Sequence, residues 1–107
     1  MIKIFYRKDG KIESCQSETE LAVISKDAVL WIDLLQPSGD QKRAVEAYLG
    51  TEIQSRAEAE EIESSSRFSE EDGVIFANTN FLSPADDQML MDPVSFIVAG
   101  GILTTVR

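Results

Sequence analysis

The stretch VLWIDLLQPSGDQKRAVEAYLG, residues 29–50, decides the fold. Its first part is apolar at successive positions, which is typical of a strand that is buried on both faces and lies centrally in a sheet. Pro37 is expected to end this strand, because proline has no N–H to donate to a neighbouring strand. Ser38 and Gln41 have capping-box spacing, and Gly50 is a typical helix-ending glycine. The stretch therefore predicts a central strand followed by an amphipathic helix.

The residues before this stretch predict a β-hairpin. MIKIFYRK, residues 1–8, alternates apolar and polar side chains, as a strand with one buried face does. Asp9-Gly10 is a common two-residue hairpin turn, and KIESCQ, residues 11–16, fits the returning strand. SETELAVISKD, residues 17–27, is ambiguous and receives no assignment.

A second helix is predicted a few residues after Gly50. Ser55 and Glu58 repeat the capping-box spacing. The inner face of this helix is thin, because only Ala59 and Ile62 are apolar at helical spacing. We therefore expect a short acidic helix that leads into a strand.

The second half of the chain predicts two more hairpins. Their turns are expected at residues 72–73 and 100–101, where Asp-Gly and Gly-Gly stand. A strand is expected from Val74 to about Leu82, and SPADDQMLMD, residues 83–92, is expected to be a polar loop. The order of elements predicts an α/β (α+β) fold with a mixed, partly antiparallel sheet and two helices on one face.

Composition and charge limit the classes of function. The 107 residues suit one domain, and 19 acidic against 10 basic residues give a net charge of −9. This charge argues against nucleic acid or an anionic membrane surface as partner, and it favours cations or basic protein surfaces. No apolar segment approaches the roughly 20 residues that cross a bilayer.

The chain contains no histidine and one cysteine, Cys15. Catalytic Ser-His-Asp and Cys-His arrangements and histidine-bound zinc are therefore excluded. Any metal would be held by oxygen ligands, which suit magnesium, calcium or manganese. No tightly bound cofactor is expected.

The densest group of candidate ligands is acidic: Glu58, Glu60, Glu61 and Glu63. Four carboxylates on about two helical turns repel one another and could bind a divalent cation. The same pattern is also typical of a solvated helix face, and Glu58 would serve the capping box. A cation site would need a further ligand from another segment or subunit.

Two residues of the central strand attract attention. Asp33 lies within an apolar run, so its carboxylate needs a partner, and backbone N–H groups at the end of the strand are the expected donors. Trp31 is expected to be a core residue. Five further acids are expected to lie in turns as surface charge: Glu70, Glu71, Asp72, Asp86 and Asp87.

Residues 28–107 resemble the soluble domain of the CorA family of magnesium and cobalt transporters. The first matching stretch is Trp31-Ile32-Asp33-Leu34 with Pro37 and the closing pair Leu49-Gly50. SRAEAEEIESSSRFSEEDG, residues 55–73, and PVSFIVAGGILTTVR, residues 93–107, follow in the family's order and at its spacing. The first 27 residues resemble the family only in being strand-like.

The resemblance implies an amino-terminal part of a larger α/β/α cytoplasmic domain. Family members are homopentamers in which long helices and two transmembrane helices follow this domain, with a Gly-Met-Asn loop at the pore. The chain would then lie on the cytoplasmic side of the membrane and would carry no Mg²⁺ or Co²⁺ by itself. Because helices from later sequence cover the sheet in the family, an apolar sheet face is expected to be exposed or covered in an oligomer contact.

The resemblance also implies a regulatory cation site. In the family, acids at interfaces between protomers bind magnesium and hold the channel closed. By spacing from Leu49-Gly50, the matching acids are Glu58 and Glu61, with partner carboxylates from the absent long helices.

Two alternatives remain open from the sequence. The first is a stand-alone acidic domain that binds basic protein surfaces; a strand running to the last residue argues against it. The second is a magnesium-dependent enzyme built on carboxylates, for which Asp33 and Glu58 are the only pair worth examining. A pocket between these two residues would favour the enzyme, and separation on opposite sides of the sheet would exclude it.

Overall fold

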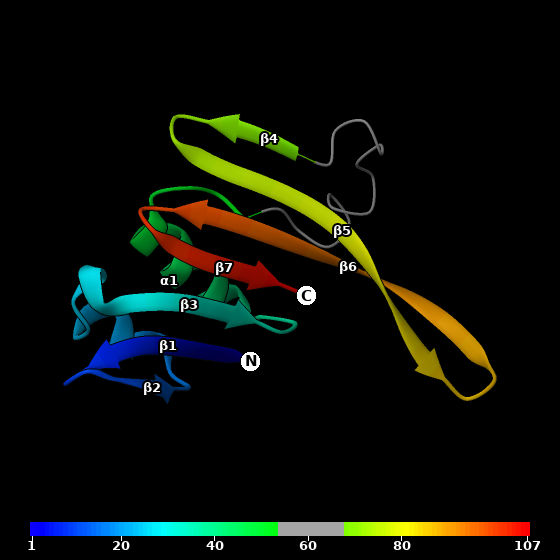
Figure 1. The fold of residues 1–107 in the computed structure, drawn as a ribbon, viewed down its shortest axis with the longest axis horizontal. Coiled ribbons are helices and arrows are strands. Elements are labelled where there is room, and N and C mark those ends of the chain that lie inside the picture. The colour runs from blue at the N-terminus through cyan, green and yellow to red at the C-terminus, as the bar shows by residue number, and fades with distance from the viewer. Residues whose placement is uncertain (54–67) are drawn as a thin grey trace.

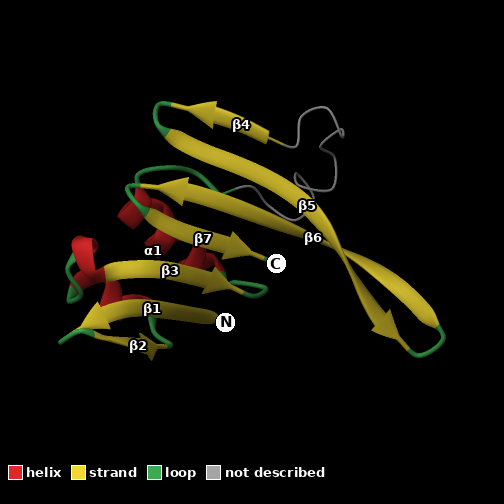
Figure 2. Ribbon diagram, viewed as in Figure 1, coloured by secondary structure: helices red, strands yellow, loops and turns green. Residues whose placement is uncertain are grey.

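The computed structural model describes residues 1–53 and 68–107, apart from the side chain of residue 83. Seven strands form one sheet, shown in Figures 1 and 2. The strands are β1 (Ile2–Lys8), β2 (Lys11–Cys15), β3 (Val29–Leu34), β4 (Phe68–Glu71), β5 (Val74–Ala85), β6 (Gln88–Ala99) and β7 (Ile102–Val106). The helices of the described residues are α1 (Gly39–Leu49) and the 3-10 helices η1 (Glu18–Ala22) and η2 (Lys26–Ala28).

The sheet is mixed, with the strand order β2-β1-β3-β7-β6-β5-β4. β3 and β7 are parallel, and every other neighbouring pair is antiparallel. The parallel pair is possible because α1 and the strands after it return the chain to the side of β3. The predicted mixed, partly antiparallel sheet is confirmed.

The local chemistry of residues 38–50 explains helix α1. The Ser38 hydroxyl oxygen accepts from the Gln41 N–H at 3.2 Å, and the Ser38 N–H donates to Gln41 Oε1 at 3.1 Å. At the other end Gly50 has φ 73°, a left-handed conformation that glycine adopts without steric cost. Val45 is the buried residue of the helix. The predicted capping box and C-terminal glycine are confirmed.

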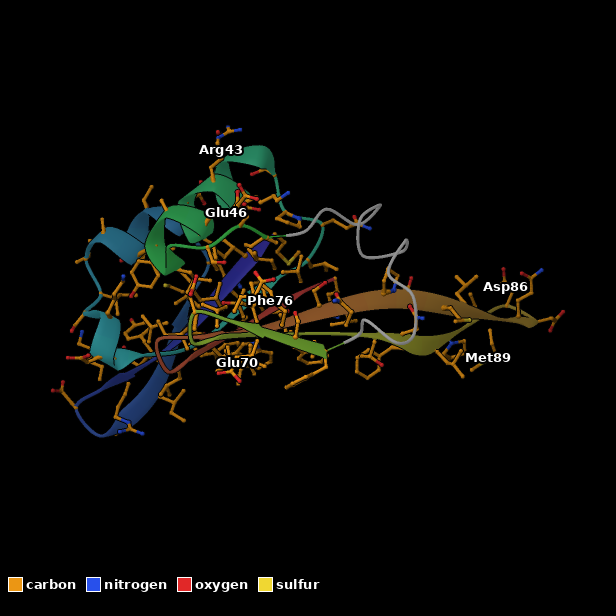
Figure 3. All side chains as sticks on the ribbon, turned by 90° about the horizontal axis from the view of Figure 1, so that it is seen from above. Arg43, Glu46, Glu70, Phe76, Asp86 and Met89 are labelled. Atoms are coloured by element: carbon orange, nitrogen blue, oxygen red, sulfur yellow. The ribbon has the colours of Figure 1, made fainter. Side chains whose placement is uncertain are left out.

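The hydrophobic core lies on the face of the sheet that α1 covers. Figure 3 shows α1 on one side of the sheet. The buried core residues are Ile2, Ile4, Leu21, Val29, Ile32, Leu34, Val45, Ile53, Ile97, Ala99 and Ile102. Ile2 and Ile4 in β1, and Ile32 and Leu34 in β3, alternate with outward-facing residues, as the pleat of a strand requires. Val29 lies beyond a register irregularity in the β1–β3 pairing.

The polar loop predicted at residues 83–92 is wrong. β5 runs to Ala85 and β6 begins at Gln88, so the two strands form one long hairpin. Its turn uses Asp86, which adopts φ 51°, a conformation that aspartate tolerates better than most residues. Serine, proline and aspartate indicated a loop, but the apolar side chains between them pair across the strands. The other predicted hairpins are present at residues 9–10, 72–73 and 100–101.

Two further expectations concern β4 and the second helix. Glu70 and Glu71, expected in a turn, lie in the edge strand β4, and only Asp72 lies in the turn itself. The predicted helix from Ser55 falls within residues 54–67, outside the described part of the chain.

Candidate functional site

The predicted metal ligands Glu58 and Glu61 lie outside the described residues, as do Glu60 and Glu63. Their placement therefore stays a prediction. Within residues 1–53 and 68–107 there is no group of three or more acidic or cysteine side chains that could hold a metal ion.

The clearest polar arrangement of the described chain joins β3 to β7. The parallel pairing places Asp33 beside Thr105. The Thr105 hydroxyl donates to Asp33 Oδ1 at 2.7 Å and accepts from the Trp31 indole Nε1–H at 2.9 Å. Arg107 Nη2 donates to Asp33 Oδ2 at 3.1 Å. We call these four side chains the Asp33 network.

The Asp33 network corrects the partner expected for this aspartate. The side chains of Thr105 in β7 and of Arg107, the residue after β7, satisfy the carboxylate, and not the backbone N–H groups at the end of β3. The Asp33 side chain is only 15% exposed, so its solvation is largely replaced by these donors, while Arg107 remains 52% exposed. Hydrogen bonding to Asp33, together with its charge, raises the pKa of Arg107. The sequence signal was the pair of polar residues in the last strand, but their partner depends on strand order.

Trp31 is not the core residue that the sequence indicated. It is 36% exposed and stacks on Phe5 of the neighbouring strand, with ring centroids 4.7 Å apart. β3 is apolar on both faces, but α1 covers only the face of Ile32 and Leu34. Trp31 lies on the opposite face, which we call the open face. Its apolar members, joined by the strand register, are Phe5, Trp31, Phe96, Val98 and Leu103.

The open face contains a shallow hollow beside the Asp33 network. Its volume is about 440 Å³. The lining residues are Trp31, Asp33, Leu35, Gln36, Phe81, Asp92, Val94, Phe96, Thr105 and Arg107. Aromatic walls and a satisfied ion pair suit contact with another polypeptide better than acid–base catalysis, because Asp33 already accepts from two side chains.

A second hollow lies between the C-terminal end of α1 and β4. Its volume is about 850 Å³, and Arg43, Glu46, Glu52, Glu71 and Phe76 are among its lining residues. Figure 3 labels Arg43, Glu46 and Phe76 on this side of the sheet. Glu46 has a structural partner, because its Oε2 accepts from the Ile53 N–H at 2.8 Å.

Comparison with known proteins identifies the family. The whole chain aligns with the magnesium transport protein CorA of Salmonella typhimurium at 33% identity and with that of Escherichia coli at 30%. The chain is a CorA-family domain. The CorA protein of Pectobacterium atrosepticum is 38% identical over 75% of the chain. No protein-family model matches the chain.

The extent of these matches matters as much as their identity. The chain spans 33% of the Salmonella CorA protein and 26% of the Pectobacterium protein. The Salmonella alignment includes the first 27 residues, whose resemblance to the family in the sequence is only that they are strand-like.

The fold agrees with that of a solved CorA structure. The complete CorA magnesium transporter of Methanocaldococcus jannaschii matches 99% of this chain with a TM-score of 0.66, at 14% identity and over 32% of its own length. In the described part of the present chain, every helix is too short or too polar to cross a membrane.

Proposed function

We propose that this chain is the cytoplasmic part of a transport protein of the CorA type that carries magnesium, with cobalt as a second ion. The observation that carries the proposal is the alignment of the whole chain with a magnesium transport protein at 33% identity. The shared fold supports it. Because the chain spans about a third of these relatives, the proposal assigns transport to the whole protein, in the membrane and as a homopentamer.

The role proposed for this chain within the transporter is cation sensing by Glu58 and Glu61. Two carboxylates close in sequence repel each other, and a divalent ion relieves that repulsion when a neighbouring chain supplies further oxygen ligands. An ion that binds only the assembled closed state shifts the equilibrium toward it. The net charge of −9 supports attraction of cations to the domain.

The direct test is magnesium uptake by the complete gene product in a bacterium that lacks its own magnesium transporters. The proposal expects growth at low magnesium and uptake of labelled or fluorescently reported Mg²⁺. A complete protein that is membrane-inserted yet gives no uptake of either ion would contradict it. A complete protein that stays soluble would favour the acidic protein-interaction domain, which the exposed open face also suits.

A further inference from the structure

The outer part of the β5–β6 hairpin projects from the sheet as a two-stranded arm. β4 pairs only with residues 74–77 of β5, and β7 pairs only with residues 95–99 of β6. Residues 80–93, which we call the arm, therefore have no further strand beside them in the described chain, and Figure 1 shows them extending away from the body. Two strands alone are marginally stable in water, so an arm of this kind gains stability from a partner.

The surface of the arm indicates what that partner must offer. Leu82, Met89 and Met91 are each 60% to 63% exposed, although the register places Leu82 directly opposite Met91. The turn carries Asp86 and Asp87, and no lysine or arginine occurs between residues 68 and 106. The arm is therefore both apolar and negatively charged, and its partner should present cations beside exposed apolar atoms.

The tip of the β1–β2 hairpin presents such a surface. Arg7, Lys8 and Lys11 surround the turn, and the neighbouring Ile12 is 68% exposed. Lys8 and Lys11 are directly opposite each other in the antiparallel register. Like charges in this position destabilise the pair, and the turn supplies one carboxylate, Asp9, against three cations, so a further carboxylate from outside would relieve the remaining repulsion.

We infer that the arm of one chain docks on the β1–β2 tip of a second copy of this chain. Figure 1 shows the arm and this tip at opposite ends of the molecule, so one chain cannot make the contact with itself. Arm-to-arm pairing is disfavoured because it would bring Asp86 and Asp87 of two copies together. The contact uses different surfaces on the two copies, and such head-to-tail contacts generate rings or filaments. It does not depend on the proposed transport role or on magnesium.

The experiment is sedimentation velocity of the 107-residue chain over a concentration series in low and high salt. Three variants accompany the wild type. The arm variant is Asp86→Asn/Asp87→Lys/Gln88→Lys, in which asparagine keeps a residue that tolerates φ 51° at position 86. The tip variant is Lys8→Glu/Lys11→Glu. The control, Lys42→Glu/Arg43→Glu, makes the same charge change as the tip variant, but on α1.

If the arm docks on the tip, the wild type, the control and the two variants should differ in whether they associate. Wild type and control associate in low salt, and the apparent dissociation constant rises about tenfold or more in high salt because exposed charges are screened. The arm variant alone and the tip variant alone remain monomeric. An equimolar mixture of the two associates again, because each like-charged end then finds an opposite one.

Three results would overturn the inference. One is a wild-type chain that stays monomeric at low salt and about 100 µM, a concentration at which interfaces with micromolar dissociation constants are populated. Another is association of the tip variant as strong as that of the control. The third concerns a chain that carries both the arm and the tip substitutions. If this chain binds wild type as strongly as the arm variant does, the contact does not use the tip of the arm variant, which would indicate arm-to-arm pairing. Circular dichroism of each variant distinguishes lost contact from lost fold.

Discussion

At the scale of single residues, Asp33 is a largely buried charge with partners, whereas two buried hydroxyls of the described residues, those of Tyr48 and Thr104, have no hydrogen-bond partner. Asp33 accepts hydrogen bonds from the side chains of Thr105 in β7 and of Arg107, the residue after β7. Tyr48 Oη is buried and has no hydrogen-bond partner among the described residues. Burial and the charge of Asp27 raise the pKa of Tyr48. Substitution of Asp33 is therefore expected to lower the free energy of unfolding, and substitution of Tyr48 is not.

Asp33→Asn is expected to lower the free energy of unfolding by about 1 kcal/mol, since Arg107 is half exposed and solvent screens the pair. The measurement is urea unfolding at neutral pH. Asp40→Asn is the matched control, because Asp40 and Arg43 form an ion pair in which both side chains are more than 70% exposed. Equal effects at the two sites would show that the partners of Asp33 add no stability beyond those of a surface pair.

Tyr48→Phe is expected to leave stability unchanged or raise it by up to about 1 kcal/mol at neutral pH, because it removes a buried hydroxyl without a partner. Since the pKa of Tyr48 is raised above its ordinary value of 10.0, the folded state keeps this proton longer than the unfolded state. The wild type should therefore lose stability as pH rises above about 10. The variant should lose less over that range. A loss of stability in Tyr48→Phe at neutral pH would mean that the hydroxyl has a partner after all.

At the scale of elements, helix α1 and the hairpins show local sequence chemistry acting directly. Both ends of α1 are determined by residues that lie within or next to it. The turns at residues 9–10, 72–73 and 100–101 all combine two residues with positive φ. These conformations match the twist of the flanking strands, which explains why the turn positions could be predicted without knowing the sheet.

The two glycines at the ends of α1 provide a matched pair of substitutions. Gly50→Ala is expected to lower the free energy of unfolding by about 1 kcal/mol, because φ 73° is unfavourable for a residue with a Cβ atom. Gly39→Ala makes the same chemical change where the nearest atoms to the new Cβ atom belong to the exposed guanidinium end of the Arg43 side chain, which can shift, so little change is expected. Thermal or urea unfolding measures both. A larger effect at Gly39 than at Gly50 would refute this account of the C-terminal cap.

At the scale of the whole molecule, the sheet is covered by α1 on one face, while Trp31 and Val98 remain more than a third exposed on the other. Exposed apolar patches of this kind are typical of contact surfaces. The arm adds a second exposed apolar region at one end. The domain therefore presents two surfaces that suit polypeptide contacts.

The proposed cation site belongs to the complete assembled protein. Glu58→Gln/Glu61→Gln is expected to raise, severalfold, the magnesium concentration that protects the complete protein from proteolysis, because two ligand charges are removed. Glu70→Gln/Glu71→Gln, on the exposed strand β4, is the control and should behave as wild type. Equal protection of both variants at every magnesium concentration would exclude Glu58 and Glu61 as ligands.

The sequence by itself determined the helix caps, three hairpin turns, the mixed sheet and, through its motifs, the family. These features depend on residues close together in the chain or on an ordered set of matching stretches. Only the tertiary structure decided that Trp31 is about a third exposed, that Asp33 is held by Thr105 and Arg107, and that residues 83–92 extend two strands into an arm. The physical reason is that strand order and the covering of each sheet face depend on contacts between residues more than 70 positions apart, as in the pairing of β3 with β7. A local pattern can show that a strand is apolar on both faces, but not which face another element will cover.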